Sequence, residues 1–228
     1  MRFSIQAIKY FENLKTPKSL NAGIDIINPY KSKDVKNVVK EFYNKFYNDY
    51  DKRIFIWGIN PGRFGGGLTG ISFTDPVALR ESCGVENSLG NRKELSSKFI
   101  YNVIERFGGN KRFFSKVYLT ALYPFAIIKD GKNYNYYDEK FLAEKLKPEI
   151  IKTIREQIKF GARKDFTIIL GKKNADYLKT INDKEHFFDE VRTLEHPRYI
   201  MQYKLKKLKY FTDKYIDLIS RPLSSKIS

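Results

Sequence analysis

The stretch IFIWGINPGRFGGGLTGISF (residues 54–73) joins an apolar run to a loop that contains six glycines. The run IFIW at 54–57 predicts a short strand buried on both faces, as in the middle of a parallel sheet. Glycines in such number are typical of a chain that bends sharply or lets another group approach closely. Open α/β sheets bind ligands at the carboxyl ends of their strands, so we expect this loop to line a site.

Strand-like and helix-like segments alternate around this stretch. The other strand candidates are 117–122, 166–170 and 188–194. Apolar residues at helical spacing are Ile5, Ile8, Phe11 and Leu14, and then Val35, Val38, Val39, Phe42 and Phe46. Later helix candidates are 95–107, 139–159, 172–181 and 202–220, with Pro148 expected to break or kink its helix. The order predicts an α/β fold, a three-layer α/β/α sandwich around a central, mainly parallel four-stranded sheet.

No repeat or low-complexity linker divides the chain, so we expect one domain over 1–228. Within it, 1–50 should form a helical N-terminal part and 221–228 a flexible tail. The first fifteen residues carry charge every few positions, which excludes a signal peptide or membrane span there. The single cysteine, Cys83, excludes an intramolecular disulfide and a metal cluster held by cysteines alone. We expect a cytoplasmic monomer with no membrane partner.

The charge of the chain favours a polyanionic partner. Lysine and arginine total 43 against 26 acidic residues, which gives a net charge of +17. Such a field attracts nucleic acid by releasing its condensed counterions. The alternative is a compositional preference for lysine without function.

The glycines formally allow a nucleotide site as well. Gly65, Gly67 and Gly70 spell G-x-G-x-x-G. A dinucleotide fingerprint begins at the end of a strand and opens directly into a helix. Here seven residues separate Trp57 from Gly65, and we expect no helix before Asp75–Pro76. The context therefore disfavours a nucleotide cofactor.

Three side chains offer a different chemistry. Asn60 follows the strand directly, and its amide can orient a water molecule by accepting a hydrogen bond. Phe73 offers a face on which a planar ring could stack. His196, placed before Pro197, could donate to an oxygen that gains negative charge, although an exposed turn histidine is the simpler interpretation in isolation. His186 lies in a polar stretch and is expected on the surface.

The residues after His196 fit a DNA contact. Arg198, Tyr199 or Ile200 could act as a wedge between stacked bases. Lys204, Lys206 and Lys207 could hold phosphates.

The pattern G-I-N-P-G…F-G…T-G-x-x-F at 58–73, with H-P at 196–197, resembles the uracil-DNA glycosylase superfamily, and most closely its single-strand-selective monofunctional branch. The resemblance implies a DNA repair enzyme that flips uracil out of single- or double-stranded DNA and hydrolyses its N-glycosidic bond, leaving an abasic site. It implies no metal and no cofactor. Asn60 would position the hydrolytic water, Phe73 would stack on uracil, and His196 would stabilise the departing uracil anion.

The same resemblance implies a substrate pocket, with the glycines letting the backbone lie close to the flipped base. Its expected members are Gly58, Ile59, Pro61, Gly62, Phe64, Gly65, Gly70, Phe73 and Ala121. Ala121 stands where the family has an asparagine that reads the base edge, which leaves Thr120 or Asn174 as candidate readers and other deaminated bases as candidate substrates. The chain also has H-P-R-Y at 196–199, where the family usually has H-P-S-P.

Two other functions stay open at this point. One is a non-catalytic nucleic-acid-binding protein on the same scaffold, which the charge alone would permit. The other, less favoured, is a nucleotide-dependent enzyme that uses the glycine-rich loop.

Overall fold

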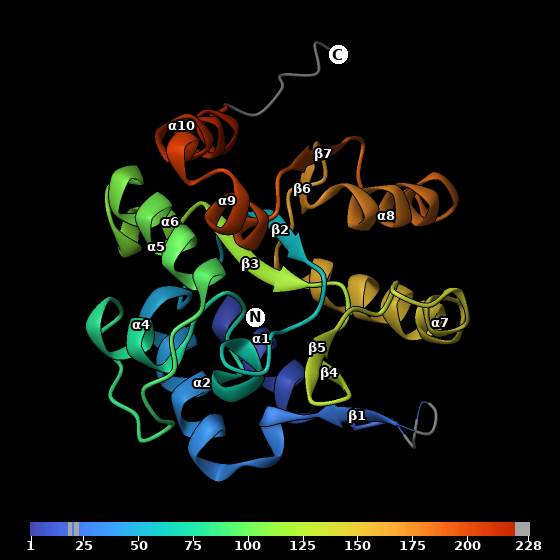
Figure 1. Cartoon of the computed structure of the whole chain (residues 1–228). Helices are drawn as coiled ribbons and strands as arrows, with labels where there is room; N and C mark the ends of the chain where they lie inside the picture. The colour runs from blue at the N-terminus through green and yellow to red at the C-terminus, as the bar shows by residue number, and fades with distance from the viewer. Residues whose placement is uncertain (18–19, 21–22, 222–228) are drawn as a thin grey trace.

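A four-stranded parallel sheet forms the middle of the molecule in the computed structural model, which describes residues 1–17, 20 and 23–221 (Figure 1). Its strand order is β3-β2-β6-β7. The strands are β2 (Ile54–Gly58), β3 (Val117–Ala121), β6 (Thr167–Leu170) and β7 (Val191–Leu194). β2 and β3 pair in register, so that Gly58 lies beside Ala121 at their carboxyl ends. The expected central sheet is confirmed.

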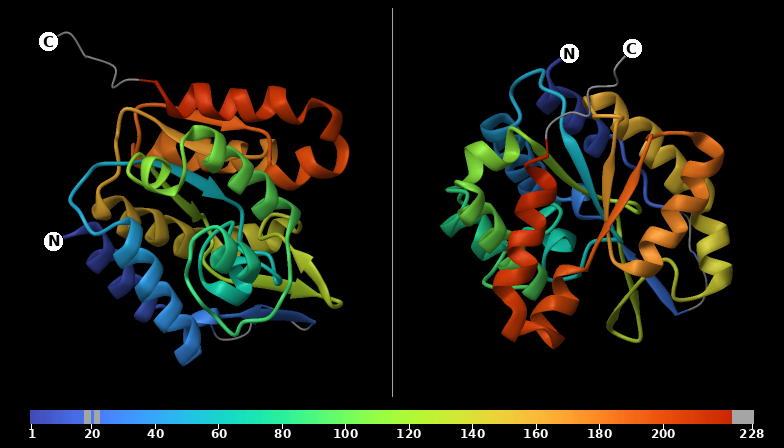
Figure 2. Two further views of the ribbon diagram at one scale, coloured as in Figure 1. Left: turned by 90° about the vertical axis from the view of Figure 1, so that its left-hand side faces the viewer. Right: turned by 90° about the horizontal axis from the view of Figure 1, so that it is seen from above.

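Helices cover both faces of this sheet (Figure 2). One face carries α5 (Leu95–Phe107), α6 (Asn110–Phe114) and α10 (Leu208–Ile219), and the other carries α7 (Lys140–Gln157) and α8 (Lys172–Glu185). The pair α1 (Phe3–Glu12) and α2 (Lys33–Phe46) packs together near the N-terminus. The expected three-layer sandwich is therefore confirmed. None of the helices in the described part of the chain has the length and hydropathy of a membrane span.

A second, antiparallel sheet was not expected from the sequence. Its order is β1-β4-β5, with β1 at Ile24–Ile27, β4 at Ala126–Lys129 and β5 at Lys132–Tyr134. β1 belongs to the segment that was expected to be helical. β4 and β5 form a hairpin whose two turn residues, Asp130 and Gly131, have φ angles of +49° and +67°. Asp-Gly between short strands is a strong hairpin signal, so the sequence held this information.

The expected break at Pro148 and the expected single helix over 202–220 were wrong, while a kink at Pro148 stays a prediction. α7 runs unbroken through Pro148, because Pro148 and Glu144 are exposed and water can satisfy the carbonyl that lacks a donor. The expected final helix 202–220 is divided into α9 (Pro197–Tyr203), a 3₁₀ turn at Leu205–Lys207, and α10. Lys204, with φ −130°, leaves the helical region and ends α9.

Two local details also differ from expectation. In α1 the buried side chains are Phe3, Ser4, Ala7, Tyr10 and Phe11, whereas Ile5 is exposed. A short helix, α3 (Gly66–Thr69), lies inside the glycine loop, so the expectation of no helix before Asp75 was wrong. Asp75 does cap α4 (Pro76–Glu81), accepting from the amides of Val77 and Ala78. The expected tail lies outside the described residues beyond 221.

Candidate active site

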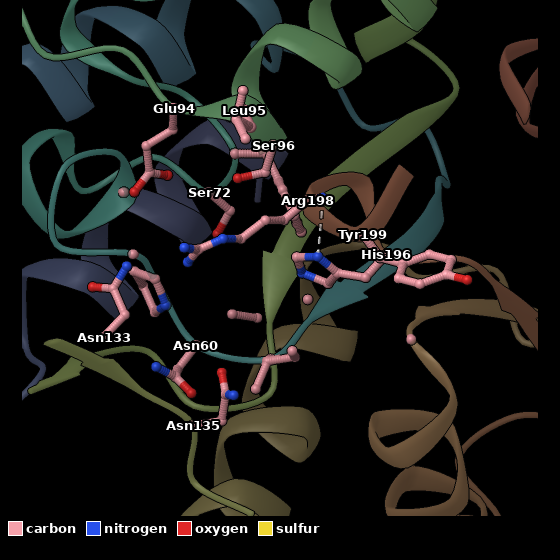
Figure 3. Close-up of a pocket in the computed structure, with 18 of the residues that line it drawn as sticks. Asn60, Ser72, Glu94, Leu95, Ser96, Asn133, Asn135, His196, Arg198 and Tyr199 are labelled. Carbon is pink, nitrogen blue, oxygen red and sulfur yellow. Dashed lines mark hydrogen bonds between the residues drawn. The ribbon is translucent and has the colours of Figure 1, made fainter. Parts of the chain in front are cut away.

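A pocket of about 520 Å³ opens at the carboxyl ends of β2 and β3. Its walls are the loop after β2, the segment 133–137 that begins in β5 and leaves the β4–β5 hairpin, the start of α5, and the start of α9 (Figure 3). Pockets of 300–1,000 Å³ hold small organic ligands, so this one has room for a nucleobase with its sugar.

Asn60 is fixed at the mouth of β2 by the backbone of the hairpin segment. Its Nδ2 donates to the carbonyl of Tyr134 at 3.0 Å, and its Oδ1 accepts from the amide of Tyr136 at 3.2 Å. The side chain is half-buried. Because an amide oxygen has two lone pairs, Oδ1 can still accept from a water molecule in the pocket.

Phe73 lies against the end of β2 in a strained backbone conformation. Its φ is +58°, which is costly for a residue with a bulky side chain and is found mostly at functional sites. A Cβ atom on Gly58 would lie 2.6 Å from Cζ of Phe73, so only glycine leaves room for the ring. The ring centroid is 6.1 Å from that of His196. Phe73 and His196 therefore share one part of the pocket wall.

His196 is the N-cap of α9, and Pro197 takes the first helical position. Its Nδ1 accepts from the amide of Arg198 at 3.2 Å, which assigns the single proton of the neutral ring to Nε2 (Figure 3). Burial, with a smaller contribution from the nearby charge of Arg198, lowers the pKa of His196 to about 4. His196 is therefore neutral at pH 7 and offers one N–H donor.

The glycines of the loop are explained by contacts inside the protein. A Cβ on Gly62 or Gly65 would collide with the carboxylate of Glu94, and one on Gly67 would lie 2.7 Å from the carbonyl oxygen of Gly62. Gly70, with φ +72°, packs under helix α2. These contacts show that the loop is closely packed inside the protein. Gly58 and Gly62 also line the pocket, and the close approach of the loop backbone to a base stays a prediction.

Glu94 was not found from the sequence. Its half-buried side chain lies between the loop and the start of α5. Burial raises the pKa of Glu94 and the charge of Asp75 adds to this, while the amides of Phe64 and Gly65 and the charge of Arg198 oppose it. In Figure 3 the Arg198 side chain extends from α9 across the pocket toward the side where Glu94 lies.

The structure brings most of the expected site residues together. Those that line the pocket are Gly58, Ile59, Asn60, Pro61, Gly62, Phe64, Phe73, Ala121, His196, Arg198 and Tyr199. Those that lie outside its lining are Gly65, Gly70, Ile200, Lys204, Lys206 and Lys207. Ile200 is fully buried against the core, which removes it as a wedge.

Neither candidate substitute for the base-reading asparagine reaches the pocket. Thr120 donates to Oε1 of Gln157 at 2.7 Å on the opposite side of the sheet. Asn174 is buried and accepts from the hydroxyl of Tyr136 at 2.6 Å. Ala121 lines the pocket with a methyl group alone.

Several lining residues were missed. The main ones are Asn133, Asn135, Tyr137, Gln202 and Tyr203, with Ser72, Lys93, Glu94, Leu95 and Ser96. Those on the hairpin segment and at the start of α5 are distant in the sequence from the expected site residues, whereas Ser72, Gln202 and Tyr203 lie close to them. The Asp-Gly turn could have revealed the hairpin, although no signal in the sequence places it over Asn60.

An exposed aromatic rim lies beside the pocket on α9. Tyr199 and Tyr203 are 43% and 70% exposed, and their ring centroids are 5.6 Å apart. Nζ of Lys204 lies 6.0 Å from the Tyr199 ring centroid, and Lys206 and Lys207 are exposed next to it. Aromatic rings bordered by lysines are typical of surfaces that bind single-stranded nucleic acid. Across the described residues, no cluster of three or more potential metal ligands is formed by His, Cys, Asp or Glu.

Comparisons with known proteins agree with this geometry. The family model described as "Uracil DNA glycosylase superfamily" matches residues 44–219. The structure is similar to the crystal structure of wild-type Pedobacter heparinus SMUG2, with 40% sequence identity and a TM-score of 0.91. That match covers 96% of this chain and 97% of the other. No curated protein matches the chain.

Proposed function

The chain belongs to the uracil DNA glycosylase superfamily, and from this premise we propose that it excises uracil from DNA and leaves an abasic site. The observation that carries the proposal is the meeting of Asn60, Phe73 and His196 in one pocket. They come from a strand end, a strained loop and a helix N-terminus that are separated by up to 136 residues in the sequence, the difference between 196 and 60. A protein that only binds nucleic acid needs no such combination.

In the proposed reaction, the flipped uracil stacks on Phe73 and the bond between its N1 and C1′ of the sugar breaks. The sugar gains positive charge and the uracil gains negative charge, which spreads onto its carbonyl oxygens. Nε2–H of His196 donates to one of these oxygens, and a neutral donor suits this task because it keeps its proton. Oδ1 of Asn60 holds a water molecule that attacks C1′, and the proton that this water releases on bonding to C1′ neutralises the uracil anion.

The proposed DNA contacts lie on α9 and the turn after it. Tyr199 and Tyr203 stack on bases, and Lys204, Lys206 and Lys207 bind phosphates. Arg198 or Tyr199 fills the space that the flipped base leaves. Extrusion costs a few kcal/mol and is cheapest for mispaired or single-stranded uracil, so both forms of DNA are proposed substrates.

The test uses labelled oligonucleotides with one uracil, single-stranded and paired with guanine or adenine, followed by alkali cleavage of abasic sites. Hypoxanthine and xanthine substrates belong in the same series. Wild type should produce strand breaks at uracil. Asn60→Ala should not, and Asn37→Ala, at an exposed asparagine on α2, should match wild type. Tight binding of the oligonucleotides by wild type without any base release would instead favour the non-catalytic alternative.

A further inference from the structure

Asn135 offers a group that can read the edge of a base. It is half-buried and lines the pocket. It belongs to the hairpin segment 133–137, whose backbone forms the hydrogen bonds that fix the Asn60 side chain. We propose that Oδ1 of Asn135 selects the base by accepting a hydrogen bond from its ring N–H, which for uracil is N3–H. This assignment deepens the proposed glycosylase function and rests on it.

The orientation of the Asn135 amide is fixed by Asp138. Nδ2 of Asn135 donates to both carboxylate oxygens of Asp138, at 3.1 and 3.3 Å, and its backbone amide donates to Oδ2 at 2.8 Å. A flip of the amide would turn its oxygen toward the carboxylate, and two acceptors would then repel each other. The amide group therefore keeps its nitrogen on Asp138 and its oxygen free.

That oxygen is directed into the pocket. Figure 3 shows the Asn135 side chain beside Asn60, with its oxygen on the side of the pocket interior. Within the described part of the chain, Oδ1 of Asn135 has no hydrogen-bond partner. Asn133, the other asparagine on this wall, differs because its Oδ1 accepts from the amide of Arg63 at 3.0 Å. The acceptor that is free to meet a ligand is thus on Asn135.

A fixed acceptor distinguishes uracil from cytosine. Uracil carries a hydrogen on N3, whereas N3 of cytosine carries a lone pair at the same place. Cytosine would set two acceptors against each other and would leave Oδ1 unpaired on removal from water. Sites that hydrogen-bond a substrate N–H can discriminate by about 10⁴-fold against analogues that lack it.

The location of Asn135 also links selection to chemistry. Tyr134 and Tyr136, its two neighbours in sequence, make the backbone hydrogen bonds that hold the Asn60 amide. The proposed base reader and the proposed water-holding group thus belong to one short, cross-linked piece of backbone. A base accepted by Asn135 is consequently held in a fixed place relative to Asn60.

The experiment compares binding of three uncleaved probes by wild type and variants. Each probe is a single-stranded oligonucleotide with one 2′-fluoro nucleotide, carrying uracil, 3-methyluracil or cytosine, because the fluorine resists loss of the base. Wild type should bind uracil at least tenfold more tightly than 3-methyluracil or cytosine. Asn135→Ala should bind all three within about twofold, because the acceptor is gone and space for the methyl group is created.

Asp138→Ala is the second variant, and it leaves Asn135 in place. Its freed amide can rotate and present Nδ2 to the N3 lone pair of cytosine, so the preference for uracil over cytosine should fall at least fivefold. The control is Asp176→Ala, at an exposed aspartate on α8, which should keep the wild-type ratios. Thermal melting of all variants checks that the fold is kept.

The outcomes separate the two proposals. Retention of wild-type probe ratios by folded Asn135→Ala would overturn the role of Asn135, even if wild type excises uracil. That role is also overturned if Asn135→Ala slows excision of uracil but leaves the probe ratios unchanged, since Asn135 would then act on the water molecule. Wild type that releases no uracil yet shows Asn135-dependent ratios would overturn catalysis and support the base reader.

Discussion

Two of the walls of the pocket, the loop after β2 and the hairpin segment, are built on different principles. The wall formed by residues 58–73 follows the central strand directly, and glycines let it fold tightly around the side chain of Glu94. The wall formed by residues 126–137 is an antiparallel hairpin and the turn after it, held by ladder hydrogen bonds and by β1. The first wall carries Asn60, but the second wall fixes its amide. The difference teaches that a strand-end residue with the right chemistry can depend on a distant hairpin for its geometry.

The largest effect should come from the residue that the two walls share. Asn60→Ala removes the proposed holder of the water molecule and the hydrogen bonds to Tyr134 and Tyr136. We expect single-turnover excision of uracil to fall by about 10³-fold or more, because positioning of reactants is worth several kcal/mol. Near-wild-type rates from a folded Asn60→Ala protein would show that the water molecule is held elsewhere.

A substitution at His196 tests the chemistry contributed by α9, which belongs neither to the glycine loop nor to the hairpin segment. His196→Ala should slow excision by roughly 10²–10³-fold through loss of one donor. With a pKa of about 4, the ring stays neutral from pH 6 to 8, so His196 should give no step in the rate over that range. The unfolded chain, with a histidine pKa of about 6.5, binds the proton more readily. The free energy of unfolding should therefore decrease as pH falls from about 6.5 to 4, and His196→Ala should lose this part of the decrease. A rate step near pH 6.5 that disappears in His196→Ala would contradict the neutral ring.

A change in the hairpin turn tests the dependence of the first wall on the second. Gly131 has φ +67° and open space around it, so Gly131→Ala strains the turn by about 1 kcal/mol. We expect the rate of excision to fall by about tenfold because the side chain of Asn60 is held less firmly. This is a smaller effect than the roughly 10²-fold loss of rate that a displacement of a full ångström causes. Gly109→Ala is the matched control, since Gly109 also has a positive φ and open space but lies at the start of α6. If both variants lose the same activity, the link between hairpin and Asn60 is not supported.

The smallest effect should come from the packing of the glycine wall itself. Gly65→Ala should lower the free energy of unfolding because its Cβ meets the carboxylate of Glu94. Glu94→Ala removes that obstacle, so the double variant should regain about 0.5–3 kcal/mol relative to additivity. Chemical denaturation of the four proteins measures this coupling. Additive losses would mean that Gly65 is required for another reason.

Local patterns in the sequence were sufficient to predict the central sheet and several helix starts. The apolar runs at 54–57 and 166–170 predicted buried parallel strands because strands covered on both faces must be apolar along their whole length. The capping pair Asp75–Pro76 predicted the start of α4 for a similarly local reason. The order of strands then placed Asn60 and His196 at one end of the sheet, and the resemblance in the glycine loop supplied their expected roles.

What only the tertiary structure decided are the contacts between segments distant in sequence. Pro148 stays inside α7 because of where its turn faces, and Ile200 is buried because α9 packs against α5. The Asp130–Gly131 signal marks a hairpin, but no local property of residues 133–137 states that they will lie against Asn60. The sequence by itself therefore determined the sheet and the residues at its strand ends, through local periodicity and chemistry. The carboxylate of Glu94 beneath the glycines depends on packing between segments more than 25 residues apart, the separation of Glu94 from Gly65. The free amide oxygen of Asn135 depends on packing across more than 70 residues, the separation of Asn135 from Asn60. Local conformational preferences do not encode contacts over such distances.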